Sequence, residues 1–159
     1  MKPELGRIDR VRPAVRSGAD PASGRDGPGR IKVCLVAVGL GIGGTEGQLL
    51  ELATRLDPRR FDVLVCSLKE DGVIAQELRA RGSRVVSLGG RGAWDLRVPV
   101  RLWRLLGRER PDIVHGFLHW ANVVVRLAGR LRNVPIIVSS YRNVVGWNNL
   151  FHRLMDRVT

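Results

Sequence analysis

The sequence predicts an α/β fold in which a mostly parallel sheet is flanked by helices on both faces. Three observations lead to this prediction. From Ile31 onward, short apolar segments alternate with longer segments of helical period. The apolar segments, such as KVCLVAV and FDVLVCSL, are continuous rather than alternating, which is typical of strands buried on both faces. Glycine or asparagine follows several of the helical segments, where helix ends are expected.

The elements follow in a regular order along the chain. The expected strands are Ile31–Val38, Phe61–Leu68, Arg84–Leu88, Asp112–Phe117 and Pro135–Ser139. The expected helices cover 45–56, 72–81, 97–109 and 120–132. In the first helix one apolar face is formed by Leu49, Leu52, Ala53 and Leu56. The expected helix C-terminal ends are at Gly82, Gly107 and Asn133. Strands joined by helices in this way predict right-handed crossovers and a Rossmann-type sheet.

The two ends of the chain differ from this pattern. Residues 1–30 hold four of the eight prolines and seven basic residues but few large apolar ones, which predicts a disordered basic tail. After the last strand, Leu150, Leu154 and Val158 predict one more helix. Another strand is expected after such a helix, so we expect the domain at 31–159 to be incomplete at its C-terminus.

The net charge restricts the classes of partner. The chain has 27 Lys+Arg against 15 Asp+Glu, a net charge of +12, which favours acidic partners such as phosphorylated substrates or an anionic membrane face. Among the basic residues only Lys2, Lys32 and Lys69 are lysines. We attribute so strong an arginine bias in part to codon composition and expect no nucleic-acid partner.

The cysteines and the N-terminus predict a cytoplasmic protein. Cys34 and Cys66 lie in apolar strands, without CxxC spacing or companion histidines, so we expect buried thiols rather than a metal site or a disulfide. The N-terminus lacks the apolar segment of a secretory signal. The longest apolar stretch is far shorter than the ~20 residues of a membrane-spanning helix.

The turn after the first strand is rich in glycine and reads Gly39-Leu-Gly41-Ile-Gly43-Gly44-Thr-Glu46. Glycine lets a diphosphate approach the backbone, and the following helix directs free N–H groups at it. We therefore expect an anion-binding loop. Its first, second and fourth glycines also satisfy G-x-G-x-x-G, and Glu70 and Asp71 follow the second strand where an acid would hold a ribose. An NAD(P)-binding domain is thus an open alternative.

Two longer segments carry a family resemblance. GGTEGQLLELATRLDPRRFDVLVCSL and RPDIVHGFLHWANVVVRLAGRLRNVPIIVSSYRN resemble the N-terminal domain of family-4-type glycosyltransferases. The resemblance favours this family over an NAD(P)-binding domain. It implies one half of a B-type architecture of two Rossmann-type domains, in which the N-terminal half holds mostly the acceptor. It further implies that a sugar moves from a nucleotide-sugar to a hydroxyl acceptor with retention, without a metal or other cofactor.

The resemblance also implies site residues. It places the donor diphosphate near Gly43 and Gly44. Many relatives carry His-x-His after the fourth strand, but Phe117 stands here at the second position, and His119 is the weak catalytic candidate in its place. The acceptor-side candidates are Glu46, His115, Asn122, Arg142 and Asn143.

Three of these candidates have a structural alternative. Asn122 is equally suited to capping the helix that begins near it. His115 is suited to local packing or hydrogen bonding at a strand end. Arg142 is suited either to clamping an acidic group or to capping the sheet edge.

A further expectation concerns partners. The E-x7-E motif of the family's C-terminal domain is not found in these 159 residues. A separate C-terminal donor domain is therefore the expected partner, and the chain alone is expected to be inactive. A third hypothesis is a non-catalytic remnant that binds anions or a membrane and exposes apolar surface.

The segment 97–109 adds a membrane hypothesis. Its arginines flank Trp103 and an apolar stripe, which suits peripheral contact with anionic lipid at the inner membrane face. The alternative is a crossover helix with a solvated outer face. The arginines concerned are Arg97, Arg101, Arg104 and Arg108.

Overall fold

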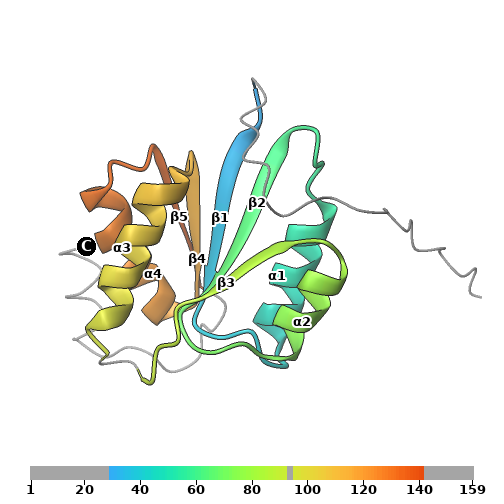
Figure 1. Ribbon diagram of the computed structural model, residues 1–159, viewed down its shortest axis with the longest axis horizontal. Helices are drawn as coiled ribbons and strands as arrows, with labels where there is room; N and C mark the ends of the chain where they lie inside the picture. Colours follow the sequence, from blue (N-terminus) through green and yellow to red (C-terminus); the bar gives the residue numbers. More distant parts are fainter. Residues whose placement is uncertain (1–28, 93–94, 142–159) are drawn as a thin grey trace, which may run out of the picture.

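The computed structural model describes residues 29–92 and 95–141, which form alternating strands and helices (Figure 1). The strands are β1 (Ile31–Ala37), β2 (Phe61–Ser67), β3 (Arg84–Ser87), β4 (Ile113–Phe117) and β5 (Ile136–Ser140). The helices are α1 (Gly44–Arg55), α2 (Val73–Ala80), α3 (Arg97–Glu109) and α4 (His119–Leu131). The strands and helices expected between Ile31 and Ser140 are confirmed, and no end differs by more than one residue.

The five strands form one sheet in the order β3-β2-β1-β4-β5, and every neighbouring pair is parallel. The strands run outward from β1 to β3 at one side of the sheet. The chain then crosses back to β4 beside β1, and β5 forms the other side of the sheet. Ala37, the last residue of β1, is in register with Phe117, the last residue of β4. The carboxyl ends of β1 and β4 therefore meet where the strand order reverses.

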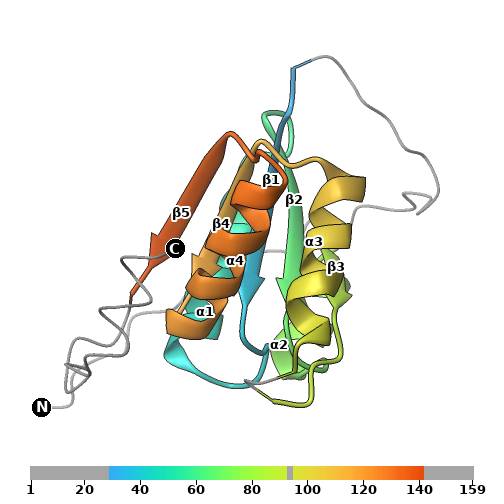
Figure 2. The ribbon, with the colours of Figure 1, turned by 90° about the vertical axis from the view of Figure 1, so that its left-hand side faces the viewer.

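The helices form one layer on each face of the sheet. Figure 1 shows α1 and α2 on one side and α3 and α4 on the other, and in Figure 2 α3 and α4 lie in front of the strands. Side chains of β1 alternate between the two cores: Cys34 and Val36 pack with α3 and α4, and Leu35 packs with α1 and α2. This two-sided burial explains why the apolar segments are continuous.

Two of the three expected helix ends are confirmed. Gly82 and Asn133 follow α2 and α4 in the left-handed region, with φ of 81° and 53°. Each end has the longer hydrogen bond of a Schellman motif. After α2, Ser83 N–H donates to Leu78 O at 2.9 Å, and after α4, Val134 N–H donates to Gly129 O at 2.9 Å.

The prediction for Gly107 was wrong, because this residue lies inside α3, which ends at Glu109. Its role is steric. A Cβ at Gly107 would lie 2.5 Å from the guanidinium carbon of Arg132. That guanidinium lies 3.5 Å from the ring centroid of Trp103, and its Nε donates to Trp103 O at 2.9 Å. Gly107 thus leaves room for the cation–π contact that joins α4 to α3.

The ends of the chain are only partly within the described residues. The expected tail at 1–30 lies outside them except for Gly29 and Arg30, and Arg30 already donates to Phe61 O at 2.9 Å. The helix expected around Leu150 lies outside them. Within 29–92 and 95–141, no helix is long and apolar enough to cross a membrane.

Both cysteines are buried free thiols, as expected. Burial raises the pKa of the Cys34 thiol to about 12, with a smaller contribution from the nearby Glu109 carboxylate. Burial also raises the pKa of the Cys66 thiol well above its usual value. Both thiols are therefore protonated at neutral pH and are poor nucleophiles in the folded chain.

The core predicts a clear contrast between two leucines. Leu102 of α3 is 0% exposed and Leu96, just before α3, is 82% exposed. We expect Leu102→Ala to lower the free energy of unfolding by about 2–5 kcal/mol, because it removes buried methyl groups and leaves a cavity. Leu96→Ala should change it by less than about 0.5 kcal/mol. Urea unfolding of the two variants measures this, and equal effects would contradict the packing described.

Candidate functional site

The candidate site is the edge of the sheet where β1 and β4 end. Two helices begin there, α1 at Gly44 after β1 and α4 at His119 after β4. Helix N-termini carry free N–H groups and a partial positive charge. In open parallel sheets, ligands bind at this edge where the strand order reverses.

The glycine loop after β1 presents an uncapped helix N-terminus. Gly43 is the N-cap residue of α1 in an extended conformation, and no side chain caps it. Residues 41–44 are exposed, and the Ile42 side chain at the tip is 88% exposed. The N-terminus of α1 is therefore exposed and uncapped, and anion binding there stays a prediction.

Of the two glycines in the expected diphosphate position, only Gly43 has a close neighbour. A Cβ at Gly43 would collide with a carboxylate oxygen of Glu46, whereas a Cβ at Gly44 would meet nothing within 4 Å. Glu46 lies in the first turn of α1, so its negative charge is favourable beside the positive end of the helix. Within the described residues Glu46 forms no ion pair.

Gly72 contacts the backbone of the glycine loop, a role that was missed from the sequence. It is the N-cap residue of α2, and its Cα faces the backbone of Leu40 and Gly41. Ile74 N–H donates to Leu40 O at 3.0 Å. No local pattern reveals this role, because it depends on a contact across the sheet edge.

Ser140, in the segment before Arg142 at the end of the last strand, has a role that sequence reasoning did not predict. Its carbonyl oxygen accepts hydrogen bonds from Leu118 N–H at 3.1 Å and from Asn122 Nδ2 at 3.0 Å. Its hydroxyl lies 2.7 Å from His115 Nε2. Ser140 thus joins the end of β5 to both β4 and the turn that begins α4, where Leu118 has a φ of 70°.

Asn122 lies inside the fold. It is 0% exposed, and the capping interpretation was wrong because Leu118, not Asn122, is the N-cap residue of α4. Its side chain packs against Gly116, where a Cβ would lie 2.6 Å from Asn122 Oδ1. That oxygen has no hydrogen-bond partner in the described part of the chain. The position of Asn122 suits it to holding the β4–α4 turn in place.

The histidines differ in their surroundings. His115 faces β5 and stacks on Phe117 with ring centroids 4.2 Å apart. Phe117, at the position where many relatives have a second histidine, is 0% exposed and belongs to the core beneath α1. His119 begins α4, with its ring 6.3 Å from that of Tyr141. Arg142 and Asn143 lie outside the described residues.

The acidic residues after β2 bear on the dinucleotide alternative. Asp71 Oδ2 accepts a hydrogen bond from Arg79 at 2.6 Å, and Asp71 Oδ1 accepts one from the Ser87 hydroxyl. These two hydrogen bonds lower the pKa of Asp71 below its usual value. Both carboxylate oxygens are therefore engaged within the protein rather than free for a ribose.

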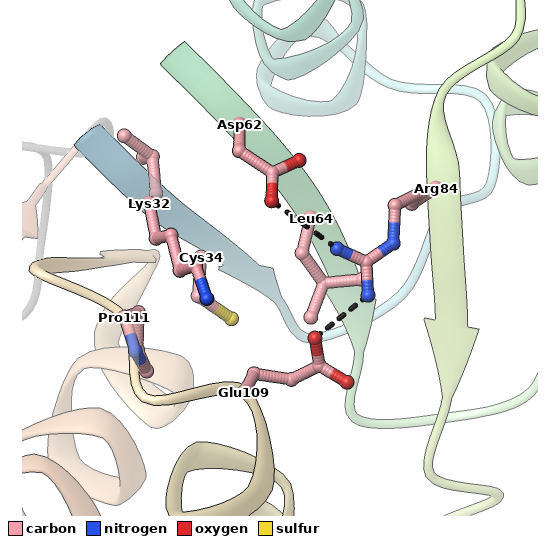
Figure 3. Close-up of a pocket in the computed structure, with 8 residues that line it drawn as sticks. Lys32, Cys34, Asp62, Leu64, Arg84, Glu109 and Pro111 are labelled. Carbon is pink, nitrogen blue, oxygen red and sulfur yellow. Dashed lines mark hydrogen bonds and ion pairs between the residues drawn. The ribbon is translucent and has the colours of Figure 1, made fainter. Parts of the chain in front are cut away.

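A small pocket beside Cys34 and Pro111 lies at the opposite edge of the sheet, where β1, β2 and β3 begin (Figure 3). Arg84 bridges two acids across it, with ion pairs of 3.5 Å to Asp62 and 2.6 Å to Glu109. Partial burial acts to raise the pKa of Glu109, but the hydrogen bonds and positive charges of Arg84 and Arg108 together outweigh it and hold that pKa below its usual value. Arg84, Asp62 and Glu109 are thus paired with one another, as in a structural ion-pair network.

Within the described ranges no three His, Cys, Asp or Glu side chains come together to hold a metal ion. Those ranges leave out residues 142–159, where His152 and Asp156 lie.

The comparison with protein families decides the family. The sequence profile described as Glycosyltransferase Family 4 matches residues 42–158, which includes Gly43, Gly44 and both helix N-termini of the site. The chain belongs to this family. Among curated proteins none matches this chain in sequence.

Solved structures of glycosyltransferases share the fold. HepE from Anabaena, solved in complex with UDP, aligns with a TM-score of 0.64 at 16% identity, over 79% of this chain and 34% of that one. A glycosyltransferase from Rickettsia africae aligns with a TM-score of 0.59 at 14% identity, over 79% and 33%. A mutant O-GlcNAc transferase from Thermobaculum terrenum gives 0.52 at 23% identity, over 70% and 20%. The family-4 chain thus spans about a third of HepE.

The ion pair of Asp71 predicts a pH dependence of stability. Because its folded-state pKa is below the unfolded-state value, Asp71 stabilises the fold above the unfolded-state pKa. This contribution is lost as the pH falls through the folded-state pKa. Asp71→Asn should therefore be less stable than the natural chain at about pH 7, and the difference should disappear at about pH 2. Urea unfolding across this range tests it, and a difference that stays constant with pH would contradict the assignment.

Proposed function

We propose that this chain is the acceptor-side half of a glycosyltransferase that moves a sugar from a nucleotide-sugar to a hydroxyl acceptor. The observation that carries the proposal is the family match over the edge of the sheet where α1 and α4 both begin. The HepE structures, solved with UDP and with UDP and glucose, support a nucleotide-sugar as donor. By the same resemblance a separate C-terminal domain holds most of the nucleotide-sugar, the glycine loop of this chain contacts its diphosphate, and the transfer retains anomeric configuration.

In this proposal the first turn of α1 stabilises the leaving group. As the bond between the sugar and the diphosphate breaks, negative charge develops on the diphosphate. The free N–H groups at Gly43 and Gly44 and the helix dipole are placed to stabilise that charge without a metal ion. Exposed backbone with no side chain at these positions allows the phosphates to approach closely.

The acceptor side of the proposed site is the β4–α4 turn. His119, at the first position of α4, is the proposed group beside the acceptor hydroxyl, since Phe117 is buried in the core. Glu46, across the edge on α1, is the proposed acceptor of a hydrogen bond from a sugar hydroxyl. His115 and Asn122 would act through Ser140, by holding the turn. Arg142 and Asn143 remain proposed acceptor-side residues.

Ligand binding separates this proposal from the dinucleotide alternative. We expect UDP, and not NADH, to quench the tryptophan fluorescence of the chain in a saturable way. Gly43→Ala should weaken UDP binding, because the new Cβ and the displaced Glu46 carboxylate crowd the phosphate position. Gly47→Ala on the same helix is the matched control, since a Cβ there meets nothing within 4 Å. Tight NADH binding that UDP does not affect would overturn the proposal.

Transfer activity needs the other half of the enzyme. We expect UDP-sugar turnover only when a family-4 C-terminal donor domain is supplied together with the full chain. Activity with the donor domain alone, unchanged by this chain, would contradict an acceptor-side role.

A surface on α3 and α4 supports peripheral contact with an anionic membrane. Large apolar side chains are exposed along both helices, and the neighbouring exposed charges are arginines. The apolar residues are Leu96, Val100, Trp103, Leu127 and Leu131. Apolar side chains beside cationic ones are the combination that binds the interface of anionic lipid.

Vesicle binding tests this surface. The full chain should co-sediment with phosphatidylserine-containing vesicles at low salt and much less with neutral ones. Replacing both Arg104 and Arg130 by Glu should abolish this binding. Replacing both Arg59 and Arg60 by Glu is the control, because these residues lie away from the α3–α4 surface. This variant has the same change in net charge and the same basic residues at 1–30. Equal losses in the two double variants would show that the surface has no specific role.

A further inference from the structure

The turn between β2 and α2 runs alongside the first part of the glycine loop. Leu68 N–H donates to Ala37 O at 2.9 Å and Lys69 N–H to Val38 O at 3.0 Å. Ile74 N–H then donates to Leu40 O at 3.0 Å, and the Leu40 side chain is 1% exposed. The start of the glycine loop is thus hydrogen-bonded to the β2–α2 turn, while its tip at 41–44 is exposed.

Gly72 is the point of closest approach between the two segments. A Cβ on Gly72 would lie 2.6 Å from the carbonyl carbon of Leu40 and 2.8 Å from the nitrogen of Gly41. Both atoms belong to the backbone, so no side-chain rotation relieves the contact. Any residue other than glycine at this position must therefore move the glycine loop or α2.

The residue before Gly72 is fixed to two other elements. The Asp71 carboxylate accepts hydrogen bonds from Arg79 on α2 and from Ser87 at the end of β3. These contacts hold the β2–α2 turn against both elements. Asp71, which the dinucleotide alternative would assign to a ribose, is instead placed to support Gly72.

We propose that Asp71 and Gly72 are positioning residues of the glycine loop, which set the backbone that receives the phosphates of the ligand. The role as a phosphate-binding loop rests on the proposed function, whereas the control of loop conformation does not. Neither residue touches the ligand in this proposal. A phosphate site made of backbone N–H groups depends on the position of those groups, so a small shift of Leu40 and Gly41 lowers affinity.

The experiment compares four variants of the full chain with the natural one. Gly72→Ala and Asp71→Asn change the proposed pair. Gly129→Ala on α4 is the steric control, because its Cβ would lie 2.9 Å from Ile137 Cδ1 on β5, away from the glycine loop and the β2–α2 turn. Asp62→Asn is the ion-pair control, because its partner Arg84 lies at the opposite edge of the sheet (Figure 3).

The first readout needs no ligand. Backbone amide resonances of the loop glycines report the conformation of the free loop. We expect Gly72→Ala to shift them strongly, Asp71→Asn to shift them less, and both controls to leave them in place. The resonances followed are those of Gly39, Gly41, Gly43 and Gly44.

The second readout is titration with UDP and with inorganic pyrophosphate. Gly72→Ala should weaken binding of both by about tenfold, with Asp71→Asn intermediate and the two controls unchanged. If Gly72→Ala does not fold, the comparison of Asp71→Asn with Asp62→Asn by the same two readouts tests the inference. Loop resonances that stay in place in the pair, or that move equally in the controls, would overturn the inference. If the natural chain binds neither probe, the phosphate-binding role fails, and the loop resonances still decide the positioning role.

Discussion

The parallel pairing of β1 with β4 is the constraint on which the candidate site depends. These strands are distant in sequence, and each is followed by a helix that packs on a different face of the sheet. Their shared register ends at Ala37 and Phe117, so the two following helices begin at the same edge. Any shift of this register would change where α1 begins relative to α4. The buried side chains of β1, which contact both helical layers, fix that register because a slip of one residue would exchange the two faces.

Most of the fold between Ile31 and Ser140 could be predicted from the sequence, because its strands are buried on both faces and its helices are periodic. Local signals placed the ends at Gly82 and Asn133, where a left-handed backbone favours glycine or asparagine. The same rule failed at Gly107. There glycine leaves room for the side chain of Arg132, just after α4, and no local pattern distinguishes this cause from a left-handed backbone.

The candidate site was predicted less completely for the same reason. The glycine loop is recognisable because its residues are contiguous. Gly72 and Ser140 are not recognisable from the sequence. Gly72 matters because folding brings it against Leu40, and Ser140 because folding brings it against the β4–α4 turn. Asn122 shows the converse case. A polar residue near a helix start suggested a cap. The N-cap residue of α4 is instead Leu118, about one turn before Asn122, and the fold buries Asn122.

The buried thiols have a practical consequence for labelling this chain at a chosen position. Cys34 and Cys66 are inside the sheet and stay protonated at neutral pH, so reagents that attack thiolates react slowly with the native fold. A single cysteine introduced on the exposed tip of the glycine loop would then carry a fluorophore without removal of the natural thiols. Such a label would report directly on changes at this edge of the sheet, such as the docking of the proposed C-terminal domain.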